Sequence, residues 1–335
     1  MTNKVRPLGA FSDFVVDELP AVLKNTPHQL PAGCLKLLHP DMGRWEISER
    51  FGEKDRLVAA LDLKIAELAI VHSQLPVPQL LCRLVEAYST GLPMLLYEEI
   101  ILANPVSDMR TFTCGGVGKT EAMFYYYHAV CELHLSAVIL AVQDALSAHL
   151  VHHENLVLVA SKLKDIEHDL DIVLARMNEL GDMTKGYFAA FRGYLSTHPT
   201  RGLKGPSGAF SPGFALLEVL LRGDTLPDEY GKYLVANREY FPQQGEPIAE
   251  ALHTTKTCGS LKTIADAAAC PALTERVDVI ARFFNDFRQI HLKSLHKQIP
   301  EAVCDEVAGT GGEAKPGTFL RQRIAELRLP TNGGK

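Results

Sequence analysis

An almost wholly apolar stretch over residues 120–150 constrains the fold of this chain more than any other feature. The run is too long for a single strand, so it predicts one long α-helix. A surface helix needs a polar face, and this segment is too uniformly apolar to provide one. We therefore expect the helix to be buried on most of its sides.

Helical periodicity extends over almost all of the remaining sequence, and convincing strand patterns are missing. A glycine- and proline-rich run over residues 202–213 predicts irregular backbone. We expect an all-α fold, with a large helical domain at 111–335 and a smaller, mostly helical region at 1–110. Further helices are expected at about 54–73, 85–103, 155–180 (closed by Gly181), 184–195, 213–222, 227–238, 246–257 and 274–298.

Charge and cysteine content narrow the class of protein. The net charge of −6 offers no basic surface for nucleic acid. The seven cysteines form no CxxC or CxxCH motif, which indicates a reducing compartment and argues against a zinc ribbon and covalently attached haem. We expect no apolar run to reach the roughly 18 residues of a membrane helix, and the N-terminus lacks a signal core. These features predict a cytoplasmic protein that binds neither membrane nor nucleic acid.

The motif CGGVGKT at residues 114–120 is similar to a phosphate-binding loop but lacks one of its glycines. A phosphate loop needs glycine five positions before the Gly-Lys pair, where the backbone curls around a phosphate. Thr113 occupies that position here. We therefore interpret the motif as the start of a helix.

His291 lies on the apolar stripe of the last long helix. Ile280, Phe284, Phe287 and His291 recur at spacings of four, three and four, which place them on one helix face. A buried histidine needs a hydrogen bond, a catalytic role or a metal. The spacing by itself favours an ordinary core histidine, with a haem or metal ligand as the alternative.

Arg192 stands in aromatic surroundings just before the glycine-rich run at 202–213. A guanidinium in such a segment either extends to solvent or holds a carboxylate through two hydrogen bonds. The residue pattern alone favours the first reading. Small residues in the following run, and in AGTGGE at 308–313, permit either close approach to a flat ligand or a mobile surface loop.

Four segments occur in one order along residues 93–327. They are LLYEEIILAN at 95–104, FRGYLS at 191–196, GPSGAFSPGFALLEVLLRG at 205–223, and RQIHLK at 288–293 followed by GTGG at 309–312. In this order they resemble the indoleamine 2,3-dioxygenase branch of the haem dioxygenase superfamily. That branch includes the pyrrolnitrin-pathway enzyme that rearranges chlorotryptophan.

The resemblance implies a haem b cofactor with His291 as the proximal iron ligand. Arg288 and Glu218 would form an acidic–arginine pair behind the haem, where such a pair orients the proximal side. Ser207 would lie at the haem edge.

The resemblance also implies a substrate pocket for an aromatic amino acid or indoleamine. Arg192 would bind the substrate carboxylate. The other implied pocket residues are Tyr187 and Phe188 in the aromatic slot, Tyr97 near it, Ser207 and Gly208 against the substrate amine, and Thr310 with glycines 309, 311 and 312 in a closing loop.

Two positions depart from the family pattern. Where the family has a small distal residue, usually serine, the alignment places Tyr127 or His128, and the choice between them stays open. Either side chain could donate a hydrogen bond to bound O2 or to the substrate. Glu313 also replaces the last threonine of the family's GTGGT loop, which could alter substrate choice.

The resemblance implies cleavage of the indole C2–C3 bond of L-tryptophan or a related indoleamine with O2, giving an N-formylkynurenine-type product of the kynurenine route. An alternative is a haem-dependent rearrangement or hydroxylation of a modified tryptophan or tyrosine in secondary metabolism. A non-catalytic haem-binding protein is a third possibility, but such a protein has no need of Arg192 as a carboxylate clamp.

Overall fold

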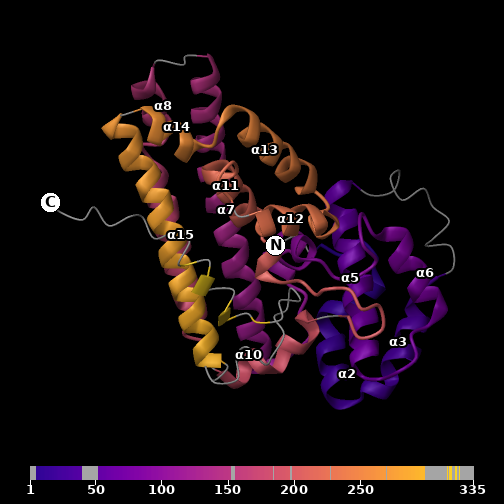
Figure 1. Cartoon of the computed structure of the whole chain (residues 1–335). Helices are drawn as coiled ribbons and strands as arrows, with labels where there is room; N and C mark the ends of the chain where they lie inside the picture. The colour runs from indigo at the N-terminus through magenta and orange to yellow at the C-terminus, as the bar shows by residue number, and fades with distance from the viewer. Residues whose placement is uncertain are drawn as a thin grey trace. The chain divides into compact units, whose positions relative to one another are not determined.

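The computed structural model describes residues 5–39, 52–151, 155–183, 185–196, 198–226, 228–268 and 270–298, with positions 315, 317, 318, 321, 322 and 324. Within these residues it contains helices and no strand, so the all-α prediction is confirmed (Figure 1). The chain packs as two units. The region expected at 1–110 lies within the first unit, which also includes later parts of the chain.

Unit 1 consists of the described residues of 5–126 and 183–210. Its core helix is α5 (Glu53–His72), whose residues 58–71 are all buried, and the helix predicted at 54–73 is confirmed. Apolar faces of the neighbouring helices cover it, and α5, α3 and α6 lie side by side in Figure 1. These neighbours are α1 (Ala10–Asp13), η1 (Phe14–Glu18), α3 (Leu30–Leu37), α6 (Gln79–Tyr88) and the π-helical η4 (Glu98–Ala103), while α2 (Leu19–Asn25) packs on η1.

The single helix predicted at 85–103 is wrong. Helix α6 ends at Tyr88, and helical structure resumes near η4. Gly91 and Pro93 lie in the interval, where proline removes a backbone donor and glycine disfavours helix. The resumed segment is held by Glu99, which accepts hydrogen bonds from Lys64 of α5 and from the Leu96 amide.

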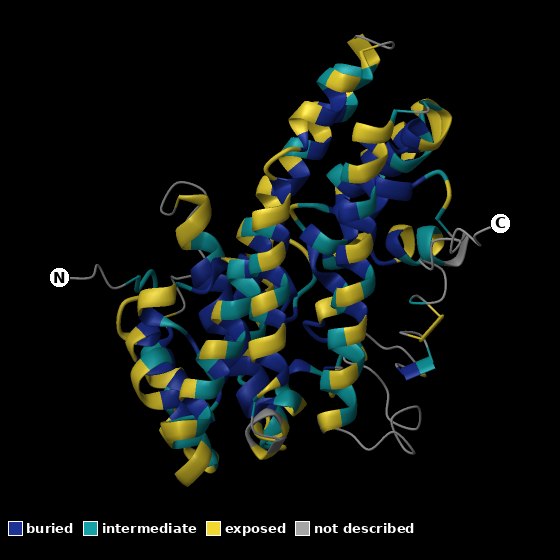
Figure 2. Cartoon of the chain, turned by 90° about the vertical axis from the view of Figure 1, so that its left-hand side faces the viewer, coloured by how far each residue is buried: buried dark blue, intermediate teal, exposed yellow. Residues whose placement is uncertain are grey.

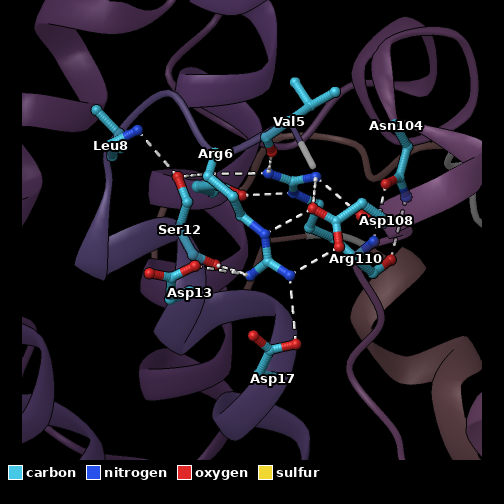
Figure 3. A network of polar contacts seen from close by, with 10 residues as sticks. Val5, Arg6, Leu8, Ser12, Asp13, Asp17, Asn104, Asp108 and Arg110 are labelled. Carbon is cyan, nitrogen blue, oxygen red and sulfur yellow. Dashed lines mark hydrogen bonds and ion pairs between the residues drawn. The ribbon is translucent and has the colours of Figure 1, made fainter. Parts of the chain in front are cut away.

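A network of buried charges fixes the first residues of unit 1 to α5 (Figure 3). The fully buried Arg110 donates to Asp62 of α5 at 2.7 Å and to the Val5 carbonyl at 2.7 Å. Ser12 donates to the other Asp62 oxygen at 2.6 Å, and Arg6 pairs with Asp108. Because breaking a buried ion pair costs about 3–5 kcal/mol, these contacts have a structural role.

Unit 2 contains the described residues of 127–182 and 211–298. In it, α9 (Ile166–Gly181) packs along α15 (Pro271–Gln298), the helix that carries His291. Gly181 closes α9 as predicted, and a Cβ at this position would lie 2.5 Å from the Ser294 hydroxyl. Around this pair lie α8 (Leu156–Lys162), α11 (Pro212–Arg222), α12 (Asp228–Ala236), α13 (Gly245–Cys258) and α14 (Leu261–Ala268).

Most helices of unit 2 agree with the predicted ranges, but two do not. The helix expected at 155–180 is broken between Lys162 and Ile166 into α8 and α9, with Lys164 and Asp165 in the break. Helix α14 was not predicted, because its residues 261–268 form too short a segment for a clear period.

Helix α7 (Gly115–Val151) contributes residues to both units and confirms that CGGVGKT is the start of a helix. Its predicted burial on most sides is wrong. Leu133, Leu140 and Val151 are 68%, 64% and 71% exposed, and Figure 2 shows helices with one buried and one exposed face.

The prediction that no apolar run is long enough for a membrane helix is also wrong, since α7 is long and apolar enough. One such helix, judged on length and composition, is weak evidence for a membrane span.

Candidate functional site

His291 lies on α15 where the helical spacing predicted it, on the stripe that contains the buried Ile280 and Phe284. Its half-buried ring is tilted by 56° against the Phe287 ring, with 5.9 Å between centroids. No hydrogen bond joins either ring nitrogen to a residue that the structure describes. Burial lowers the pKa of His291, so its imidazole is neutral near pH 7. A neutral imidazole without a hydrogen-bond partner has a nitrogen lone pair to offer a metal.

Aromatic rings from two helices form a wall beside His291. Phe214 of α11 stacks on Phe287 at 3.9 Å between centroids and lies nearly parallel to Phe283 at 5.9 Å. Such offset ring pairs stabilise a contact beyond the area that they bury. The wall fixes α11 against α15.

Glu218 and Arg288 form a buried ion pair one turn from His291. The Arg288 Nη2 donates to Glu218 Oε1 at 2.6 Å, and both side chains are buried. The Arg288 guanidinium also lies 5.5 Å from the centre of the Phe284 ring. The two residues that the resemblance paired are therefore in contact, while their role toward a haem stays a prediction.

The N-terminus of α11, whose N-cap is Ser211, is also bound by Glu132 of α7, a residue that the sequence did not single out. Its carboxylate accepts hydrogen bonds from the Ser211 hydroxyl and, at 2.9 Å, from the Gly213 amide. A Cβ on Gly213 would lie 2.6 Å from Glu132 Oε2, so the close approach requires glycine. The Ser-Pro-Gly sequence at 211–213 was a cap signal, but nothing in it identified the partner.

The two distal candidates, Tyr127 and His128, are consecutive half-buried residues of α7. The Arg176 guanidinium of α9 lies 5.5 Å from the centre of the Tyr127 ring. A hydrogen bond with Glu179 raises the pKa of Tyr127. Tyr127 is thus engaged with α9, and the choice between the two residues stays a prediction.

Arg192 ends α10 (Lys185–Arg192) in unit 1 and is half-buried, and this burial lowers the pKa of its guanidinium. The residues beside it are held by aromatic contacts. Phe191 is buried against Phe124 at 5.5 Å, and Tyr194 stacks on Phe112 at 4.4 Å with an angle of 2° between the rings. Arg192 therefore projects from a fixed backbone. Tyr187 and Phe188 also lie on α10, but their side chains are outside the described part of the structure.

The irregular backbone predicted at 202–213 is confirmed up to the start of α11 and contains only the short turn η7 (Gly208–Phe210). At Gly205 the backbone passes close to residues 195–196, and we call this close approach the neck of the loop. A Cβ on Gly205 would lie 2.2 Å from the Ser196 carbonyl oxygen and 2.4 Å from that of Leu195. This close approach brings the segment that contains the buried Ser207 near residues 195–196, which follow Arg192 in the chain.

The predicted site residues divide between the two units, and among them Arg288 and Glu218 are in contact. Unit 2 holds His291, Arg288 and Glu218, with Tyr127 and His128 on α7. Unit 1 holds Arg192, Ser207 and Gly208, and also Tyr97, which is buried at the start of η4. Thr310, its neighbouring glycines and Glu313 lie outside the described residues.

Comparisons with known proteins add no family to this geometry. No protein-family model matches the chain, and no curated protein matches it. Among the described residues, no three or more His, Cys, Asp or Glu side chains form a group that could hold a metal ion. The candidate residues thus form two separate sets: one imidazole with its aromatic wall and ion pair in unit 2, and an arginine followed by a glycine-rich loop in unit 1.

Proposed function

We propose that this chain is a haem-dependent oxygenase that acts on L-tryptophan or a related indoleamine, with His291 as the residue that would hold the haem iron. The observation that carries the proposal is the state of His291. It is half-buried and neutral, has no hydrogen-bond partner in the described residues, and lies beside an aromatic wall. A porphyrin supplies four iron ligands, so a single protein imidazole is the donor set that haem needs.

When bound, haem supplies O2 activation at its iron. The chain's own residues would do the remaining work. The Glu218–Arg288 pair would fix the helix turn that presents His291, and the rings of Phe214 and Phe287 would keep water from the macrocycle. Arg192 would hold the substrate carboxylate through two charge-assisted hydrogen bonds. Holding the amino acid in one orientation is the main demand, because the indole ring is itself electron-rich.

One observation favours the alternative chemistry, a rearrangement or hydroxylation of a modified tryptophan or tyrosine. The resemblance would put Tyr127 or His128 in the distal position, where the family has a small residue, and the Arg176 guanidinium lies over the Tyr127 ring. A large polar distal side chain could change how O2 and substrate are oriented. The half-buried Arg192, by contrast, supports either enzyme over a protein that only carries haem.

The test is reconstitution of the full chain with hemin, followed by absorption spectroscopy. We expect a Soret band that is lost or shifted in His291→Ala. The matched control is His296→Ala on the same helix, which should leave the band unchanged. An unaltered band in His291→Ala would overturn the assignment of the iron ligand. Ferrous protein supplied with L-tryptophan and O2 should then form N-formylkynurenine, detected by its near-ultraviolet absorbance, and a different product would favour the alternative.

A further inference from the structure

Glu67 is a buried carboxylate of α5 that binds a loop far from it in sequence. Its side chain is 4% exposed, and its Oε1 accepts a hydrogen bond from Arg201 Nη2 at 2.6 Å. Its Oε2 lies 3.9 Å from His198 Nε2. Burial raises the pKa of Glu67, and the hydrogen bond from Arg201 opposes that rise. Among the described residues, the hydrogen bond to this carboxylate therefore comes from the loop.

The loop over residues 198–207 is closed by its own hydrogen bonds. The buried His198 accepts the Thr200 and Arg201 amides on Nδ1, at 3.4 and 3.3 Å, and its own amide donates to the Leu203 carbonyl at 2.7 Å. Because Nδ1 accepts, the proton of the neutral ring is on Nε2, the atom that faces Glu67. Gly202 makes the turn possible with a φ of +64°. The loop thus donates one hydrogen bond to the carboxylate, from Arg201, while His198 Nε2 lies 3.9 Å from it, beyond hydrogen-bond distance.

Helix α5 contacts the chain at two points before Gly205. His72 at the end of α5 lies edge-on to Tyr194, with 4.8 Å between centroids, just before the neck. Glu67 holds Arg201, which comes before Gly205 closes the neck against Leu195 and Ser196. The residues that follow the neck are Ser207, which is buried, and Gly208.

We propose that Glu67 is a positioning residue for the ligand-binding loop, which it fixes on α5 through Arg201 so that Ser207 and Gly208 face a bound aromatic amino acid. This inference rests on the proposed function, since that function makes the loop a ligand-binding one. The physical reason is the cost of an unpaired buried charge: any motion that withdraws Arg201 leaves the Glu67 carboxylate desolvated and unpaired. A segment this rich in glycine would otherwise sample many backbone conformations.

The test compares wild type with Glu67→Gln, which keeps the side chain's size and removes its charge. The matched control is Asp266→Asn, which removes an exposed ion pair with Lys262 in unit 2. Hydrogen exchange of the full chain measures the loop directly. We expect the amides of His198, Gly202 and Phe210 to exchange faster in Glu67→Gln and to be unchanged in Asp266→Asn, because these amides close the loop.

The second measurement titrates L-tryptophan into the hemin-reconstituted full chain and follows the Soret band. We expect the affinity to fall by about tenfold in Glu67→Gln, while the band of the ligand-free protein keeps its position. Arg201→Lys keeps the charge but offers a single point donor, so it should lie between wild type and Glu67→Gln in both measurements. Circular dichroism will show whether Glu67→Gln folds. If it does not, Arg201→Lys replaces it in both measurements.

The outcomes are distinguishable. Unchanged loop exchange in Glu67→Gln, or faster exchange with unchanged tryptophan affinity, would overturn the positioning role. If wild type binds hemin but shows no response to tryptophan, the proposed substrate is wrong, and loop exchange alone decides whether Glu67 holds the loop. If the wild-type protein shows no Soret band after reconstitution, the proposed function is wrong. The same exchange measurement then decides whether Glu67 holds the loop.

Discussion

The Arg288 guanidinium donates a 2.6 Å hydrogen bond to the Glu218 carboxylate, and the pair links α15 to α11 one turn before His291. Both side chains are buried, so neither charge is well solvated. Breaking a buried pair is costly because the remaining charge stays desolvated. We expect Arg288→Met to lower the free energy of unfolding by about 3–5 kcal/mol, measured by urea denaturation.

The comparison variants for this pair separate burial from charge. Asp266→Asn removes an exposed ion pair and should cost about 1 kcal/mol or less. The double variant Glu218→Leu/Arg288→Met removes both charges and should recover most of the loss, because no buried charge is left unpaired. An Arg288→Met effect as small as that of Asp266→Asn would contradict a buried pair.

Helical periodicity was sufficient to place His291 on an apolar stripe, because spacings of three and four fix a side chain's face. It could not find the charges of α5. Lys64 pairs with a residue 35 positions away and Glu67 with one 134 positions away, so no local pattern identifies either partner. A lysine or glutamate within a helix reads as solvent-exposed until its partner is known.

Burial of α7 could not be predicted from its composition. Leu133 and Leu140 are as apolar as the buried Leu135 and Val142, yet they are exposed. Apolar content states what a helix can bury, whereas the neighbouring helices determine what it does bury. The irregular segment at 202–213 was predictable from its glycines, but the neck at Gly205 depends on the carbonyls of Leu195 and Ser196, which only the structure brings there.

Arg192→Leu tests the substrate half of the site. We expect it to weaken L-tryptophan binding to the hemin-reconstituted chain by about tenfold to a hundredfold, because hydrogen bonds to charged groups contribute about 1.5–3 kcal/mol. Spectral titration of the Soret band measures this affinity. Tryptamine, which lacks the carboxylate, is the control ligand and should bind the variant and wild type alike. An equal loss for both ligands would show that Arg192 does not recognise the carboxylate.

Gly213 and Gly231 should respond in opposite directions to alanine. A Cβ at Gly213 would lie 2.6 Å from Glu132 Oε2 and 3.0 Å from Leu135, so Gly213→Ala should destabilise unit 2 by about 1–3 kcal/mol. Gly231 lies within α12 with open space around its Cβ position, so Gly231→Ala should stabilise by about 0.5–1 kcal/mol. Thermal unfolding measures both. A stabilising Gly213→Ala would mean that α11 does not approach Glu132 so closely.

His198 should make stability depend on pH. Burial, with the charge of Arg201 adding to it, lowers the pKa of His198 from 6.5 to about 4. The folded chain therefore keeps this ring neutral where the unfolded chain protonates it, and protonation would also abolish its acceptance of the Thr200 and Arg201 amides. A histidine with a lowered folded-state pKa contributes stability above about pH 6.5 and loses it as the pH falls toward 4. Urea midpoints of wild type should fall across this range.

The variant His198→Gln isolates this contribution, because glutamine does not titrate and can still accept a hydrogen bond. We expect its midpoint to fall less between pH 6.5 and 4 than that of wild type, even though it starts lower. His253→Gln, at an exposed position of α13, is the control and should follow the wild-type curve. Parallel curves for His198→Gln and wild type would mean that His198 titrates alike in the folded and unfolded chains. In that case the neutral His198 ring would not be the group that holds the loop closed.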